Sequence, residues 1–364
     1  MQLTKGAIGN LINRYKAVLK KCHLMNTFGS LAVAGMLVMG GAGMAGAAEN
    51  TQPVVTISSF NAYNGTDATL SDGSNGKHIF VGGTINNIES LDPHTHFGTF
   101  TDPTSITVTE GTYNWDIYAG SLAVADGSTE GFEETSATSG STKLVINGGT
   151  FEGAELAGGG SASTTGTGVA SVTVQGDTSV TINSYTHTGG GLDYIMAGNK
   201  VLAGGGAATG KITGNTNLII DPAGGKNVTT TAVVLGGSGV RVFNGTDTKA
   251  SDTINGNTNV TINGGTLAGV VGGSLAEVLS GTGTGTVTVN GNTNVTVNEG
   301  IINQIKFGSN TTPGITADPS VVGGSMAYGD GAVALNKGNT LVTINGGPST
   351  TRSSAAAWPR RAAR

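Results

Sequence analysis

A repeat recurs along most of the chain, and it limits the possible folds more than any other feature of the sequence. Its clearest copies span residues 142–162 and 256–276, where an apolar and threonine-rich segment runs into Asn-Gly-Gly-Thr. Successive copies are 38, 36, 38, 42, 35 and 47 residues apart. A variable step predicts one common structural unit into which loops of differing length are inserted. Aligned on the second apolar residue of the core segment, the copies fall at Val108, Ile146, Ile182, Ile220, Ile262, Val297 and Ile344.

Within each copy the sequence alternates with a period of two. In Val260-Thr261-Ile262-Asn263 the apolar residues share one face of an extended segment and the polar residues share the other. Thr, Val and Ile favour strands, and the Gly-Gly and Asn-Gly pairs that bound them suit tight corners. We therefore predict an all-β chain after residue 48. The expected interior residues are Val145, Val260, Ile262, Val295 and Val297.

Three all-β architectures fit this pattern. In a right-handed parallel β-helix (β-solenoid) that follows an N-terminal signal helix, each repeat would form two coils of about 20 residues, with Val and Ile stacked inside and Asn and Thr ladders along the strands. A β-propeller blade of about 40–45 residues is the alternative, and Asn290-Gly291 is a hairpin signal that favours it. A β-sandwich array is the third. We prefer the β-helix because the aromatic signatures typical of blades are missing.

Charge and cysteine usage exclude several function classes. All 23 acidic residues lie after residue 48, so the repeat body is acidic and would repel nucleic acid. The single cysteine, Cys22, lies in the first 48 residues. The rest of the chain therefore has neither a disulfide framework nor a thiolate metal site.

The first 48 residues read as an extended signal peptide. A basic stretch at 1–26 precedes an apolar stretch at 28–44, and small residues follow at 45–48. We expect cleavage after Ala47 or Ala48 and export through the inner membrane by the Sec machinery. An uncleaved anchor is the alternative, but the apolar stretch is short and rich in glycine for a stable span.

The rest of the chain divides by composition. Residues 49–105 form an N-terminal entry or cap region, and residues 106–347 form the repeat array. Residues 348–364 make a basic tail that belongs to no repeat, and we expect it to be disordered or derived from truncation. Pro348 stands where complete copies continue with threonine, and proline lacks the N–H that a strand needs to pair. The tail is thus expected to lie outside the solenoid, which leaves an uncapped and aggregation-prone end.

The Val-Thr-Ile-Asn-Gly-Gly-Thr pattern and the long leader resemble the passenger repeats of bacterial type V autotransporters and adhesin-like surface proteins. This resemblance implies an exported, non-catalytic passenger of a Gram-negative bacterium, at the cell surface, associated with the outer membrane or extracellular. It implies a host or cell-surface ligand, and no stable membrane span in the mature chain. We expect the outer-membrane β-barrel translocator of that family to be missing from this chain.

Few residues suggest chemistry. Asp92, His94 and His96 are weak metal candidates, because alternation places both histidines on one side of a strand, although the setting favours a loop. We expect no catalytic residue, no cofactor and no resident metal, and we assign no role to His187. The alternative to an adhesin is a β-helix enzyme acting on polysaccharide, or another periplasmic or secreted repeat protein. Such an enzyme needs clustered acidic and basic residues on neighbouring coils, and the basic residues here are dispersed in sequence.

Overall fold

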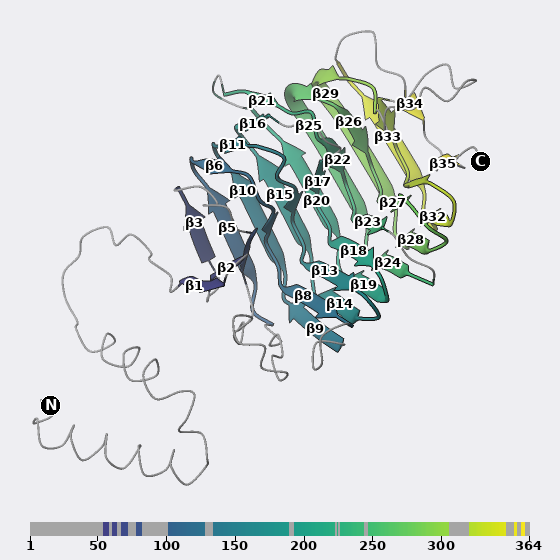
Figure 1. Ribbon diagram of the computed structural model, residues 1–364. Coiled ribbons are helices and arrows are strands. Elements are labelled where there is room, and N and C mark those ends of the chain that lie inside the picture. The colour runs from purple at the N-terminus through teal and green to yellow at the C-terminus, as the bar shows by residue number, and fades with distance from the viewer. Residues whose placement is uncertain are drawn as a thin grey trace, which may run out of the picture. The chain divides into compact units, whose positions relative to one another are not determined.

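In the computed structural model (Figure 1), all the described residues lie in one unit of the chain, residues 52–364. The predicted leader, its cleavage site at Ala47 or Ala48, and the weak metal candidates Asp92, His94 and His96 lie outside the described residues. Among the described residues, no helix is long and apolar enough to cross a membrane. The described residues are 54–57, 60–63, 67–71, 78–81, 101–127, 134–188, 193–222, 224, 226–243, 247–305, 320–346, 353–354 and 358–360.

The described strands form four sheets, here called A, B, C and D, whose strands run side by side in Figure 1. Sheet A contains β1 (Val54–Ile57), β2 (Phe60–Tyr63), β4 (His78–Val81), β7 (Ile117–Tyr118), β12 (Leu156–Ala157), β17 (Tyr194–Met196), β22 (Val233–Leu235), β26 (Gly269–Val271), β30 (Val321–Val322) and β34 (Ser353–Ser354). Sheet C contains β9 (Glu134–Ser139), β14 (Val169–Val174), β19 (Ala207–Ile212), β24 (Lys249–Ile254), β28 (Thr284–Val289) and β32 (Ala332–Asn336).

Sheet B is the largest of the four and holds two strands of most coils. It contains β3 (Asp67–Leu70), β5 (Thr104–Val108), β10 (Thr142–Ile146), β15 (Thr178–Ile182), β20 (Thr216–Ile220), β25 (Thr258–Leu267), β29 (Thr293–Ile302) and β33 (Thr340–Ile344), with the shorter β6 (Thr112–Tyr113), β11 (Thr150–Phe151), β16 (Tyr185–His187) and β21 (Val228–Thr229). Sheet D contains β8 (Leu122–Asp126), β13 (Ser161–Thr165), β18 (Lys200–Gly204), β23 (Gly239–Val242), β27 (Leu275–Val278), β31 (Met326–Tyr328) and β35 (Trp358–Arg360).

Each sequence repeat forms one coil of a parallel β-solenoid. The chain passes through sheet B, then A, D and C, and returns to sheet B beside its starting strand, in parallel. The predicted β-helix is confirmed, but the division of each repeat into two coils is wrong. Asn290-Gly291 is a corner between β28 in sheet C and β29 in sheet B, so it is not a hairpin. We number the coils I to VI from their first residues, Thr104, Thr142, Thr178, Thr216, Thr258 and Thr293.

The register along sheet B matches the sequence alignment residue for residue. Val108 pairs with Ile146, and the same column continues to Ile344. Predicted core residues Val260, Ile262, Val295 and Val297 are all buried.

The expectation for Val145 is wrong. Leu144 and Ile146 fill the interior, while Val145 points outward beside Thr107 and Thr181 and is only half-buried. In the apolar run Leu144-Val145-Ile146 the period of two cannot be read from polarity, because all three residues are apolar.

Both faces of sheet A are buried along its central strands β7, β12, β17, β22, β26 and β30. One face of β17, β22 and β26 packs with sheet B, and the other packs with residues of sheet D. Strands buried on both sides are continuously apolar, which explains runs such as Val233-Val234-Leu235. In the interior between sheets A and B, the rings of Tyr113, Phe151 and Tyr185 stack in that order, with centroids 5.1 and 4.5 Å apart.

Ladders of side-chain hydrogen bonds explain why Asn and Ser recur at equivalent positions of successive repeats. At the corner from sheet C to sheet B, the amide oxygen of Asn257 accepts a hydrogen bond from the backbone N–H of Asn292 at 2.7 Å, and Asn292 accepts one from Asn339 at 2.8 Å. At the corner from A to D, the Ser274 hydroxyl accepts from the N–H of Ser238 at 2.9 Å. These bonds satisfy corner N–H groups that would otherwise lack partners.

The two ends of the described array depart from the expected boundaries. Strands β2 and β4 already pair in parallel into sheet A before residue 104, and β1 closes that edge antiparallel to β2. In the basic tail, β34 pairs with β30 and β35 with β31, both parallel. The prediction that the tail adds nothing to the solenoid is therefore wrong for these two strands. The last described strands of sheets B and C expose Leu341, Ile344, Val333 and Leu335.

Candidate functional site

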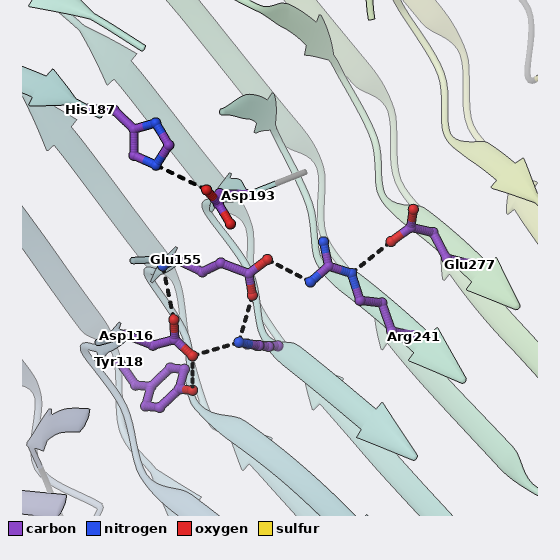
Figure 2. A network of polar contacts seen from close by, with 8 residues as sticks. Asp116, Tyr118, Glu155, His187, Asp193, Arg241 and Glu277 are labelled. Carbon is purple, nitrogen blue, oxygen red and sulfur yellow. Dashed lines mark hydrogen bonds and ion pairs between the residues drawn. The ribbon is translucent and has the colours of Figure 1, made fainter. Parts of the chain in front are cut away.

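A network of charged residues runs along the solenoid where the start of sheet A faces sheet D (Figure 2). Five successive coils supply one member each. Asp116 and Glu155 stand immediately before β7 and β12 of sheet A, in coils I and II. Lys200, Arg241 and Glu277 lie in β18, β23 and β27 of sheet D, in coils III, IV and V. Residues up to 86 positions apart are thereby brought into contact by the coiling alone.

The five residues form a continuous chain of ion pairs with alternating charge. Lys200 Nζ lies 2.5 Å from Asp116 Oδ2 and 2.5 Å from Glu155 Oε2. Arg241 Nη1 lies 2.6 Å from Glu155 Oε1, and its Nε donates to Glu277 Oε2 at 2.7 Å. The Lys200–Glu155 contact is an ion pair whose angles are not those of a hydrogen bond. Three carboxylates and two cations leave the network with one excess negative charge when all are ionised.

Aromatic rings and a backbone amide complete the surroundings of these charges. The Tyr118 hydroxyl donates to Asp116 Oδ2 at 2.7 Å, and the backbone N–H of Glu155 donates to Asp116 Oδ1 at 2.9 Å. The Arg241 guanidinium lies 4.1 Å from the ring centroid of Tyr194, which is cation–π geometry. Every charged member is therefore paired, as buried charges must be.

Burial sets the protonation states of the network. Side-chain exposure is between 2 and 15% for all five charged members. Burial by itself lowers the pKa of Lys200, but the Glu155 carboxylate and then Asp116 overcome it, so the pKa is raised and the amine is protonated at neutral pH. Burial, and then the charge of Asp116, raises the pKa of Tyr118 well above its usual value. Tyr118 therefore remains a hydrogen-bond donor.

His187 has partners that were not visible in the sequence. Its Nδ1 lies 2.8 Å from the hydroxyl of Thr231, and its Nε2 lies 3.1 Å from Asp193 Oδ2, in ion-pair rather than hydrogen-bond geometry. The ring also stacks on Tyr185 at 6.1 Å between centroids. The His187 side chain is fully buried, so it extends the interior aromatic stack and presents no ring nitrogen to solvent.

A further buried carboxylate, that of Asp252, lies outside the network, in the interior between sheets D and C. Its Oδ1 accepts from the Asn199 side-chain amide at 3.1 Å, and Oδ2 has no hydrogen-bond partner among the described residues. Gly210, its neighbour in register on the preceding coil, leaves the space that the carboxylate fills. Burial raises the pKa of Asp252 from 3.8 to about 6, against hydrogen bonds from Ser238 and Asn199 that lower it.

This pKa predicts how Asp252 affects stability with pH. The folded state holds the proton more tightly than the unfolded chain, so its stabilising contribution is complete below pH 3.8 and is lost as pH rises through about 6. Asp252→Asn mimics the protonated acid and should raise the free energy of unfolding at pH 7.5 by about 2–3 kcal/mol. At pH 4.5, where only part of that contribution has been lost, the gain should be smaller, about 1 kcal/mol. Urea unfolding of both chains at the two pH values checks this; a difference that does not change with pH would contradict it.

The charged network is not a site that the sequence analysis predicted. Among the described residues, no group of three His, Cys, Asp or Glu side chains could hold a metal ion. The space beside Glu155, Lys200 and Arg241 is about 10 Å³, room for about one water molecule. A more open hollow of about 460 Å³ lies on the outer face of sheet C, lined by Ser171, Thr173, Thr209, Lys211, Thr253 and neighbouring residues.

The sequence did contain a signal for the network. In a chain with only 11% charged residues, an Arg at 241 and a Glu at 277 stand inside strand segments at equivalent positions of their repeats. The comparisons with known proteins add no identity: no protein-family model, no curated protein and no solved structure matches this chain.

Proposed function

We propose that this chain is an exported, non-catalytic surface passenger whose β-solenoid serves as a stalk for adhesion or surface contact. The observation that carries the proposal is that its polar side chains bond to other coils of the same chain. The Asn and Ser ladders join each coil to the next, and the ion-pair network joins both adjacent coils and coils two apart. Among the described residues, these groups enclose no open site large enough for a substrate. Polar groups used in this way hold coils together along the axis, which is what an extended stalk requires.

The surface left for a partner is the outer side of the sheets. The outer face of sheet C presents hydroxyls and Lys211 around its shallow hollow. A polar, repetitive face of this kind suits weak contacts repeated along the solenoid, which add up through multivalency. The resemblance of the repeats and leader to autotransporter passengers supports the same role and an extracellular location.

The experiment tests export and adhesion separately. The full chain is produced in a Gram-negative host, and the N-terminus of exported material should begin at Ala48 or Glu49. Beads coated with the purified chain should then bind to cultured epithelial cells, or to one another, more than beads coated with the heat-unfolded chain. Export without any binding above the unfolded control would contradict the adhesive role. A chain that stays in the cytoplasm with Met1 intact would contradict export.

A polysaccharide-acting enzyme is the second candidate, because acidic and basic residues do cluster on neighbouring coils. That cluster is the feature which such an enzyme needs, and the sequence alone did not reveal it. Its charges face one another and are almost fully buried, so the stalk is the better proposal. Incubation of the full chain with acidic polysaccharides, followed by size analysis, distinguishes the two: chain cleavage that is lost in Glu155→Gln would favour the enzyme.

A further inference from the structure

The Lys200 amine contacts two carboxylates, those of Asp116 and Glu155, although one would suffice for an ion pair. The amine and the Asp116 carboxylate are 2.5 Å apart, on coils III and I, and Glu155 of coil II places a second carboxylate oxygen 2.5 Å from the same amine. All three side chains are buried to about nine-tenths or more. An amine and an acid in contact are the two reactants of an amide condensation, and the second carboxylate places a negative charge beside the amine.

The two oxygens of Asp116 are also held in different ways. Oδ1 accepts the backbone N–H of Glu155 at 2.9 Å, a fixed donor where negative charge would develop in a tetrahedral intermediate. Oδ2 accepts the Tyr118 hydroxyl at 2.7 Å and the Lys200 amine at 2.5 Å, which suits an oxygen that leaves as water. An ion pair alone does not require that both carboxylate oxygens accept hydrogen bonds, with the backbone donor on Oδ1 and the two side-chain donors on Oδ2.

We infer that Lys200 and Asp116 condense in the folded chain to an internal amide (isopeptide) bond, with the Glu155 carboxylate beside the amine offsetting the positive charge on nitrogen in the intermediate. Lys200 Nζ passes a proton along its 2.5 Å hydrogen bond to Asp116 Oδ2, which yields a neutral amine beside a neutral acid. Nζ then attacks Cγ, and the N–C bond forms. A second proton passes from Nζ to Oδ2, the Cγ–Oδ2 bond breaks, and water leaves. Glu155 and Tyr118 are unchanged, and no oxidant or other reactant is consumed.

Position within the fold supplies the driving force. In water, an amine and a carboxylate do not condense, but groups held in contact can reach effective concentrations of about 10⁵–10⁸ M. Burial disfavours the charged pair, and Arg241 offsets part of the charge of Glu155. The Glu155 carboxylate nevertheless keeps the amine mostly protonated, so the bond should form slowly after folding. The product would link coils I and III across coil II, between residues 84 positions apart.

Mass spectrometry of the purified full chain tests the inference directly. After prolonged incubation at neutral pH, the intact mass should be lower than the sequence mass by one water, with the N-terminus identified from its own peptide. Trypsin should fail to cleave after Lys200, and the peptide that contains Lys200 should be joined to the one that contains Asp116. A chain of unchanged mass, cleaved after Lys200, would overturn the inference.

Three variants separate this reaction from other losses of water. Lys200→Arg keeps the cation but has no amine that can condense, so its mass should equal that of its sequence. Asp116→Asn should lose one ammonia in place of water, because the Lys200 amine then displaces the amide nitrogen. Glu155→Gln should remain uncrosslinked while circular dichroism shows a folded β-structure. A water loss that persists in Lys200→Arg would place the reaction elsewhere, for example at Asp126-Gly127, and would overturn the inference. Cross-linking of Glu155→Gln at the wild-type rate would overturn the role of Glu155.

Discussion

Ile262→Asp should abolish folding or lower the free energy of unfolding by roughly 4 kcal/mol or more. Ile262 is completely buried between Ile220 and Val297 in the column that runs through sheet B. Substitution removes a large apolar side chain and places a carboxylate in a dry lobe where nothing pairs with it. Because every coil contacts its neighbours through this column, the defect weakens two interfaces at once. Thr261→Asp, on the outer face of the same strand, should cost about 1 kcal/mol or less.

A matched pair of isoleucines gives the control for this prediction. Ile219 and Ile220 are adjacent in β20, but Ile220 is buried whereas Ile219 points outward and is 38% exposed. Ile220→Asp should therefore resemble Ile262→Asp, and Ile219→Asp should resemble Thr261→Asp. Urea unfolding followed by far-UV circular dichroism measures all four. Similar losses for the inner and outer members of a pair would show that the assignment of faces is wrong.

The success of the sequence analysis in sheet B has a physical reason. There, one face of each strand packs against the core and the other faces solvent, so apolar and polar residues alternate. This alternation indicates both the register of each repeat and which of its residues point inward. Alternation fails where both faces are buried, as in sheet A, or where the outward position is apolar, as at Val145. In those places the sequence still indicates a strand but not which side chain points inward.

The sequence analysis missed the ion-pair network for a different reason. Its contacts join coils, and the residues in contact are 36 to 86 positions apart. Such pairs become visible only when the length of one coil is known. Dividing each repeat into two coils would place Arg241 and Glu277 two coils apart, whereas one coil per repeat places them side by side on β23 and β27. The basic residues are dispersed along the sequence and gathered by the winding.

Arg241→Met should lower the free energy of unfolding by about 3–5 kcal/mol, because it leaves a buried carboxylate without its cation. Arg241 is the cation that both Glu155 and Glu277 contact, and the Glu277 side chain is only 2% exposed. Methionine retains much of the apolar stem that packs near Tyr194, so the loss reports mainly on charge. Lys211→Met is the control: Lys211 is an exposed cation on sheet C, and its removal should change stability by less than about 0.5 kcal/mol.

The double variant Arg241→Met with Glu277→Gln identifies the origin of that loss. If the cost comes from an unpaired buried charge, neutralising Glu277 should recover part of it, and the two changes together should cost less than the sum of the single changes. High salt should leave the loss in Arg241→Met largely intact, because ions screen buried pairs weakly. A loss that is additive in the double variant and disappears at high salt would mean that the network behaves as a surface salt bridge. The coils would then be held together by their apolar columns and amide ladders alone.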